Sequence, residues 1–214
     1  MDELELLKKD WKKDEAGRFP KLTYEDIYSM ILKKSSSIVK WIFIISILEF
    51  IFWTVISFAL KDADFNKRFD SYHAENIMIP FMVLGYLILG YFFYRFFMNY
   101  RTISATDNAK KLMENILKTR RTVKQYVGFN LIYMALSAFV VLGIQFNKDE
   151  DMISLIDQAA ANGELFKFYA VTILATLAAL AVLIAVILGF YYLIYGILLK
   201  RLNRNYRELK RLEV

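Results

Sequence analysis

The sequence FYAVTILATLAALAVLIAVILGFYYLIYGILL, residues 168–199, contains no charged side chain along its whole length. A bilayer core of roughly 30 Å is crossed by about 20 residues of helix, so this stretch is long enough to span a membrane. Its backbone N–H and C=O groups would find no water in hydrocarbon, and a helix is therefore predicted because it pairs them internally. Since the run exceeds the required length, we expect it to tilt or to project beyond the hydrocarbon.

Three further stretches N-terminal to this one have the same apolar character. We place these predicted spans at residues 38–60, 77–98 and 127–146. The four spans make up a membrane domain at 38–199, which includes a helical cytoplasmic connection at 99–126. The sequence therefore predicts an all-α integral membrane four-helix bundle, with helical cytoplasmic extensions at 1–37 and 200–214.

The basic residues are distributed unequally among the segments outside the spans. The chain has 28 lysines and arginines, and all but five lie in or beside 1–40, 99–126 and 200–214. The five exceptions are Lys61, Lys67, Arg68, Lys148 and Lys167. Because positive segments stay in the cytoplasm, we predict a multi-pass protein of the bacterial inner membrane with both termini inside. This distribution assigns the net charge of +6 to orientation and to anionic lipid headgroups rather than to nucleic acid.

The composition excludes several kinds of site. Cysteine is absent and His73 is the single histidine, so the chain cannot form a thiolate or multi-histidine metal site. Asp62, Asp64 and Asn66 begin like an EF-hand loop, but Lys67 stands where that loop needs glycine. We expect no metal and no cofactor. No nucleophile–base pair or phosphate-binding loop is readable, which favours a non-enzymatic role.

Glu49 is the one acidic side chain inside a predicted span. Helical rise places it about 16 Å into the first span, near the expected midplane, where a charged carboxylate costs roughly 2.5–3.5 kcal/mol. Counting from the span ends puts Tyr86, Tyr91 and Ser137 at a similar height, with Arg95 nearer the cytoplasm, where it can snorkel. Two interpretations stay open: a hydrogen-bonded glutamate that fixes helix register, or a proton or cation site.

Two other patterns concern the ends and faces of the spans. Ala181, Ala185 and Gly189 recur at four-residue spacing, and such a small-residue strip lets another helix approach closely. That helix would belong to the same bundle or to a second copy in a homodimer. Tyrosine and tryptophan gather near the span ends, as in an interfacial aromatic belt. This group includes Trp41, Trp53, Tyr126, Tyr191, Tyr192 and Tyr195.

The predicted cytoplasmic helices carry apolar stripes that should pack on one another. We expect one stripe, made of Leu202, Tyr206 and Leu209, to contact a second in the inner connection, made of Leu112, Ile116 and Val123. A third stripe, of Leu4, Leu7 and Trp11, marks a short N-terminal helix. After it, Thr23 and Asp26 have the spacing of a reciprocal helix cap.

The stretches MDELELLKKDWKK (residues 1–13) and FPKLTYEDIYSMILKKSSSIVKWIFIISILEF (residues 19–50) resemble a family of uncharacterised flavobacterial (Bacteroidetes) four-span membrane proteins. Those proteins share a Leu-Lys-Lys-x-Trp opening, a Tyr-x-x-Ile-Tyr helix and a Lys-Lys-Ser-Ser-Ser lead into the first span. Some members carry a beta-carotene monooxygenase label. Carotenoid cleavage oxygenases hold iron with four histidines, and this chain has one. A similar Leu-Lys-x-x-Trp opening occurs in small membrane proteins that look like partners of extracytoplasmic-function sigma factors.

Two functional hypotheses follow from the sequence. The first is a membrane-anchored interaction or regulatory protein, because the distinctive polar segments all lie on the predicted cytoplasmic side, where they would meet a cytoplasmic protein partner. The second is a small proton- or cation-linked transporter or channel that uses Glu49, because intramembrane acids mark such pathways.

Overall fold

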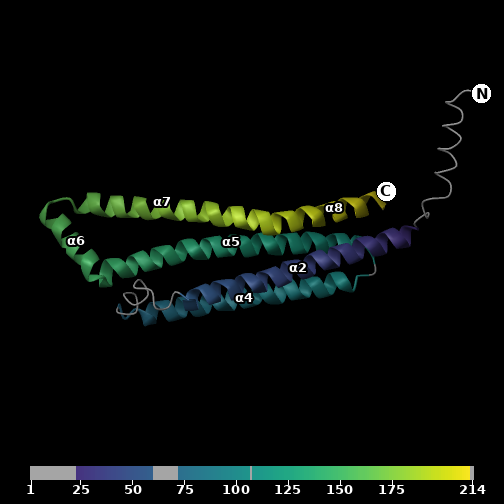
Figure 1. The fold of residues 1–214 in the computed structure, drawn as a ribbon, viewed down its shortest axis with the longest axis horizontal. Helices are drawn as coiled ribbons and strands as arrows, with labels where there is room; N and C mark the ends of the chain where they lie inside the picture. Colours follow the sequence, from purple (N-terminus) through teal and green to yellow (C-terminus); the bar gives the residue numbers. More distant parts are fainter. Residues whose placement is uncertain (1–22, 60–71, 107, 213–214) are drawn as a thin grey trace, which may run out of the picture.

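The structure is a computed structural model that describes residues 23–59, 72–106 and 108–212. All regular elements in this described part are helices (Figure 1). In chain order they are α2 (Tyr24–Ala59), α4 (Glu75–Ser104), α5 (Ala109–Lys148), α6 (Glu150–Ala161), α7 (Leu165–Tyr191), the π-helix η1 (Tyr192–Gly196) and α8 (Ile197–Leu212). Four helical stretches are long and apolar enough to cross a membrane: α2, α4, α5 and the continuous α7–η1–α8. The predicted all-α, multi-pass four-helix architecture is thus confirmed.

The helices extend well beyond the predicted spans. The third predicted span and most of the inner connection form one helix, α5, which is preceded by a short break after α4. The fourth span continues into the C-terminal tail as predicted, interrupted only by the π-helix η1. The start of α2 and the end of α8 lie at the same end of the bundle (Figure 1). The predicted helix of Leu4, Leu7 and Trp11 and the acidic loop of Asp62 and Asp64 lie outside the described residues.

Helix α2 begins with the predicted cap. The backbone N–H and the hydroxyl of Thr23 both donate to Asp26 Oδ2, at 3.1 and 2.7 Å. In return the backbone N–H of Asp26 donates to Thr23 Oγ1 at 3.2 Å. N–H groups in the first turn have no intrahelical partner, and this reciprocal arrangement satisfies some of them.

The end of the bundle that holds Tyr24 and Leu212, called the inner end below, has a closely packed core. Helices α2, α4, α5 and α8 contribute side chains that are almost fully buried: Ile31, Val39, Ile103, Leu112, Ile116, Leu202 and Leu209. The predicted contact between the stripes of α5 and α8 is therefore confirmed, with Tyr206 packed at its edge. Val123 is the exception, because it lies one layer further along the bundle, in a cluster with Tyr126 and Tyr195.

Two buried polar pairs cross this inner end. Asn205 on α8 donates to the Ser35 hydroxyl on α2 at 3.0 Å. Asn99 on α4 donates to the Thr122 hydroxyl on α5 at 3.1 Å. Each pair satisfies side chains that would otherwise be buried without a partner, and so fixes the register of two neighbouring helices.

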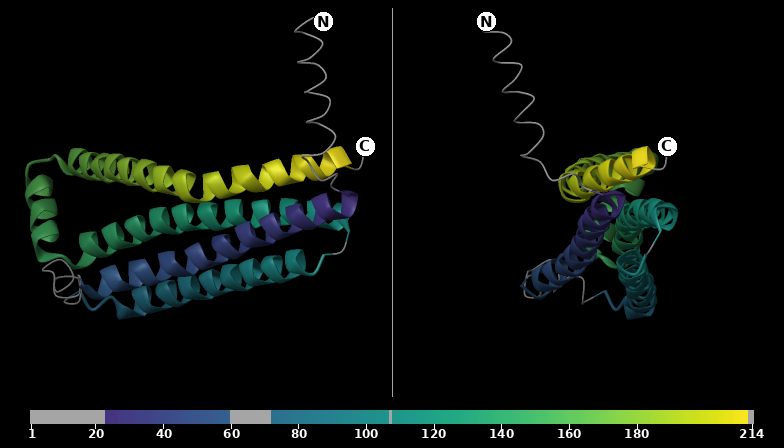
Figure 2. Two further views of the ribbon diagram at one scale, coloured as in Figure 1. Left: turned by 45° about the vertical axis from the view of Figure 1, so that its right-hand side comes forward. Right: turned by 90° about the vertical axis from the view of Figure 1, so that its right-hand side faces the viewer.

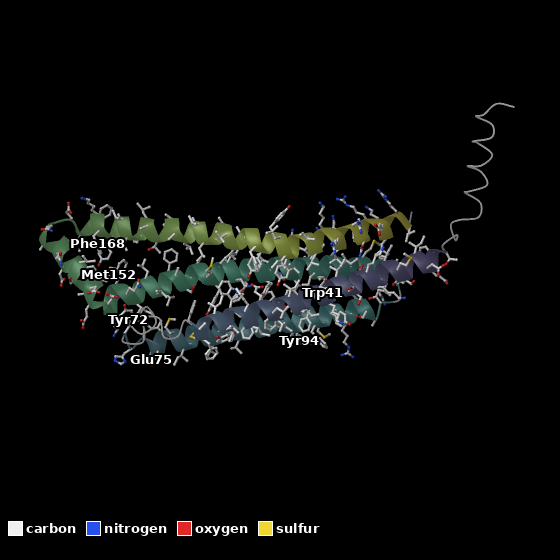
Figure 3. All side chains as sticks on the ribbon, in the orientation of Figure 1. Trp41, Tyr72, Glu75, Tyr94, Met152 and Phe168 are labelled. Carbon is white, nitrogen blue, oxygen red and sulfur yellow. The ribbon has the colours of Figure 1, made fainter. Side chains whose placement is uncertain are left out.

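The opposite, outer end is more open. Helix α6 crosses from the end of α5 to the start of α7 (Figure 1), and Tyr72, Glu75, Met152 and Phe168 lie at this end (Figure 3). Within α7 only Leu180 and Tyr191 are buried. This outer end therefore leaves most of the α7 surface unpacked by the described chain.

The small-residue strip of α7 does not pack inside the chain. Ala181, Ala185 and Gly189 are all exposed, and a Cβ added at Gly189 would meet nothing within 4 Å. Of the two alternatives for this strip, packing within the same bundle is not seen in the described chain, because α7 leans away from its neighbours towards the outer end (Figure 2).

Candidate functional site

Glu49 on α2 accepts hydrogen bonds from three tyrosine hydroxyls. Tyr126 on α5 donates to Glu49 Oε2 at 3.0 Å, and Tyr195 on η1 donates to the same oxygen at 3.1 Å. Tyr191, the last residue of α7, donates to Glu49 Oε1. One carboxylate thus joins three of the four long helical stretches.

The helices and an amide hold these tyrosines in place. Tyr191 and Tyr195 are four residues apart, so both lie on the face of the α7–η1 junction that meets α2. Asn130 Nδ2 donates to the Tyr191 oxygen at 3.0 Å, which leaves the hydroxyl hydrogen of Tyr191 for Glu49. The Tyr126 ring packs edge-on against Phe92 and Phe96, with centroids 5.6 and 5.4 Å away.

A π-helix, η1, begins directly after Tyr191 and carries Tyr195. Such single-turn π segments are rare and occur frequently at functional sites. Gly196 ends the segment, and a Cβ there would lie 3.3 Å from the Tyr192 ring. The π-helical turn of the α7–η1–α8 stretch therefore lies where this stretch contacts Glu49 through Tyr191 and Tyr195.

The hydrogen-bond pattern around Glu49 suits an ionised carboxylate. An ionised carboxylate only accepts hydrogen bonds, and all three tyrosine hydroxyls donate to it. Among the residues that the structure describes, no lysine, arginine or histidine forms an ion pair with it. The site therefore offers neutral donors but no counter-charge.

Arg95 is the basic residue that the sequence places nearest to Glu49, but its side chain bonds to another residue. Its Nη1 donates to the Tyr91 hydroxyl at 2.7 Å, and its guanidinium carbon lies 5.6 Å from the centroid of the Tyr91 ring. Its Nε is buried without a partner in the described part of the chain. Arg95 and Tyr91, both predicted at the Glu49 site, thus form a separate pair along α4.

A cavity of about 650 Å³ adjoins the carboxylate. Glu49, Tyr126, Tyr191 and Asn130 form its polar end, and side chains of α2, α4, α5 and α7 form its mostly apolar walls. The predicted residues Tyr86 and Ser137 line these walls. Ser137 donates to the Met134 carbonyl at 2.8 Å rather than to Glu49. Of the residues expected near Glu49, these two therefore share its cavity without being its partners.

The partners also change the expected depth of Glu49. Tyr126 lies two residues after Lys124 and just before the predicted third span. Helix α2 runs obliquely to α4 and α5 (Figure 2), so counting residues along α2 alone does not give the height of its partners. The polar cluster is nearer to the basic, inner end of α5 than a midplane position implies.

Sequence reasoning missed Tyr126, Tyr191, Tyr195 and Asn130. The sequence places the three tyrosines in an aromatic belt, because each lies close to the end of an apolar run. The sequence feature that points to a shared polar site is the four-residue spacing of Tyr191 and Tyr195, which puts two hydroxyls on one helical face. Among the described residues, no group of three or more histidine, cysteine, aspartate or glutamate side chains is placed to hold a metal ion.

The fold and this cluster define the class: a multi-pass helical membrane protein with a carboxylate–tyrosine site beside an apolar cavity. Within that class the chain belongs to the family DUF8845, described as a domain of unknown function, whose model matches residues 25–214. No curated protein and no solved structure matches the chain.

Proposed function

We propose that this protein binds a small amphiphilic molecule from the surrounding membrane, with Glu49 and its tyrosines as the polar end of the binding site. The observation that carries the proposal is the position of this polar cluster at one end of a cavity of about 650 Å³. Ligand pockets commonly have volumes of 300–1,000 Å³ and combine apolar walls with a few convergent polar groups. Ionisable side chains inside membrane domains also mark functional sites by default.

Access from the lipid supports the same function. Trp53, Val186 and Phe190 line the cavity, and their side chains are 52%, 66% and 55% exposed. Because these residues belong to α2 and α7, the cavity is open between those two helices. A ligand with an apolar body would enter sideways from the hydrocarbon and would not need to cross the polar inner end.

A matched pair of valines tests this function. Val186 lines the cavity, whereas Val182, one turn away on α7 and equally exposed at 66%, does not. Native mass spectrometry of the protein titrated with dodecanol and dodecylamine would count bound probe. We expect saturable binding of at least one probe to the wild type and to Val182→Trp, and its loss in Val186→Trp. Equal binding by both variants, or no saturable binding by the wild type, would overturn the proposal.

A regulatory role is the second proposal, supported by the continuity of the fourth helical stretch. Tyr191 and Tyr195 contact Glu49, and α8 continues from η1 into the inner core through Leu202 and Leu209. A ligand that shifts Glu49 would therefore act on the same continuous helix that presents the basic face to a cytoplasmic protein. Affinity capture with Glu49→Gln as the comparison bait tests this link, and recovery of the same partners in equal amounts would contradict it.

We further propose that the membrane is the bacterial inner membrane, with the inner end of the bundle in the cytoplasm. The predominance of lysine and arginine at that end supports this orientation and also suits contact with anionic headgroups. A reporter that is active only outside the cytoplasm should work when inserted within residues 147–163 and be silent after Val214. The reverse pattern would overturn the orientation.

We also propose that a second copy of the chain covers the exposed strip of Ala181, Ala185 and Gly189, since small residues at this spacing allow close helix approach. Cysteine crosslinking at Ala185 in native membranes would test this. A homodimer predicts a crosslinked pair, and a chain that stays monomeric would contradict it.

A further inference from the structure

We propose that the ligand of this cavity carries a protonated amine on an apolar body, and that Glu49 is the counter-ion of that amine. This inference rests on the proposed function, and it adds the chemical class of the ligand. Three features of the site support this ligand class: the uncompensated charge of Glu49, one free acceptor position on its carboxylate and the nature of the cavity walls.

The first step concerns charge. Tyr126, Tyr191 and Tyr195 donate to Glu49 through neutral hydroxyls, which stabilise an anion without cancelling its charge. Arg95 bonds to Tyr91 instead. None of the residues that line the cavity is a lysine, arginine or histidine. A charge removed from water is costly unless it is paired, so a cationic ligand would complete the site.

The second step concerns hydrogen bonding. An ionised carboxylate has about four acceptor positions, two on each oxygen. Tyr126 and Tyr195 both donate to Oε2, whereas only Tyr191 donates to Oε1. The remaining position is on Oε1, the oxygen that faces Tyr191, itself a lining residue of the cavity. An ammonium N–H can occupy this position, whereas an anionic head would be repelled by the carboxylate.

The third step concerns the walls. Aromatic side chains from four helices line the cavity, among them Phe50 and Trp53 on α2, Tyr86 on α4, Tyr133 on α5 and Phe190 on α7. The faces of such rings attract ammonium groups, and the rings also pack against hydrocarbon. Most of the other wall residues, among them Leu89 and Leu183, are apolar, and the small hydroxyl side chains of Thr54, Ser57 and Ser137 are the exceptions. A cationic head with an apolar tail satisfies both parts of the lining.

Three probes that differ only in their head group test the ligand class. Dodecylamine, dodecanol and dodecanoate would each be titrated into the full chain in phosphatidylcholine nanodiscs at pH 7. Native mass spectrometry would measure saturable adducts per chain. We expect dodecylamine to bind about tenfold or more tightly than dodecanol, since a desolvated carboxylate is left unpaired by the neutral head. Dodecanoate should bind most weakly.

Two variants separate the charge of Glu49 from general effects of substitution. Glu49→Gln keeps the shape of the side chain but removes the charge, so the preference for the amine over the alcohol should vanish. Tyr192→Phe removes the hydroxyl of a neighbouring tyrosine on η1 that is 77% exposed and does not line the cavity, and it should keep the preference. An amine preference that persists in Glu49→Gln would overturn the inference.

The wild-type comparison needs no variant, so the test stands even where Glu49→Gln fails to fold. Equal binding of amine and alcohol to the wild type, both lost in Val186→Trp, would overturn the cationic ligand but leave the amphiphile site in place. Failure of every probe to bind saturably would instead remove the proposed function itself.

Discussion

The inner and outer ends of the bundle differ in polarity and in packing: α8 at the inner end is rich in charged side chains, whereas α7, which runs to the outer end, has Lys167 alone, yet the inner end is packed more closely. At the inner end Leu202, Leu112 and Ile116 are 0% exposed, while in the outer part of α7 Leu174 is 64% exposed. Water around the inner end would drive apolar side chains into a protein core. Hydrocarbon around the outer end is as apolar as leucine, so it supplies no such drive. The difference indicates that stability is concentrated at the inner end, and that the outer end can keep a cavity.

The largest expected effect comes from removing a core leucine at the inner end. Leu202→Ala should lower the free energy of unfolding by about 2–5 kcal/mol, because it leaves a cavity among side chains that are fully buried. Unfolding by dodecyl sulfate in mixed micelles, followed by circular dichroism, measures the change.

Leu174→Ala is the matched control at the outer end, and its cost should stay below about 1 kcal/mol because its side chain has lipid rather than protein around it. Equal losses in the two variants would show that the outer end is packed as closely as the inner one, most directly by a second copy of the chain.

Helices α4 and α5 approach each other closely at Gly85, towards the outer end. This contact tests whether close packing at the outer end is limited to a few points. A Cβ added at Gly85 would lie 2.5 Å from the Tyr133 hydroxyl oxygen. The Tyr133 ring stacks on the Phe81 ring with centroids 4.6 Å apart, and the Tyr133 hydroxyl donates to the Phe81 carbonyl at 3.1 Å. Gly85→Ala should therefore cost about 1–3 kcal/mol in the same unfolding assay.

Gly90→Ala, one and a half turns along α4, is the control. Nothing lies within 4 Å of a Cβ at Gly90, and alanine favours helix over glycine by up to about 1 kcal/mol. We expect this variant to be neutral or slightly more stable. If both alanine variants behaved alike, Tyr133 would not be held against α4 as described.

The buried polar pairs of the inner end give an effect of the same order. Asn205→Ala leaves the Ser35 hydroxyl without its partner on α8 and should cost about 1–3 kcal/mol. Asn203→Ala removes a half-exposed partner of Arg120 and should cost less than about 1 kcal/mol. A larger loss at Asn203 would contradict the assignment of Asn205 as the buried link between α2 and α8.

Sequence patterns predicted most of the helical architecture because their physical causes are local. Long apolar runs give the spans, four-residue steps give the stripes of Leu112 and Leu202, and the Thr23–Asp26 spacing gives the cap. The partners of Glu49 were missed because they depend on how α2 crosses the other helices. Tyr191 and Tyr195 reach Glu49 from a π-helix junction that no local pattern marks. Depth counted along one helix instead favoured Tyr86 and Ser137, which share only the cavity.

The smallest effect concerns the cap of α2, at the exposed margin of the inner end. Hydrogen bonds from the Thr23 side chain and backbone hold the pKa of the Asp26 carboxyl below its usual value. A carboxyl whose pKa is lower in the folded chain stabilises the fold above its unfolded pKa of about 3.9. That contribution is lost as the pH falls through the lower, folded pKa.

Lowering the pH below the folded pKa of Asp26 should therefore loosen the first turn of α2 without affecting the inner core. The backbone N–H of Ile27 donates to the Thr23 carbonyl at 3.1 Å, so its hydrogen-exchange protection factor reports on this turn. We expect that factor to stay constant down to about pH 5 and to fall between about pH 4 and pH 2 in the wild type, and to be low and insensitive to pH in Asp26→Asn. Glu25→Gln changes the same charge one residue earlier, outside the cap, and should keep the wild-type profile. If Glu25→Gln also abolished the pH dependence, the helix dipole rather than the Thr23 hydrogen bonds would be its cause, since acidic side chains in a first turn interact favourably with the helix N-terminus.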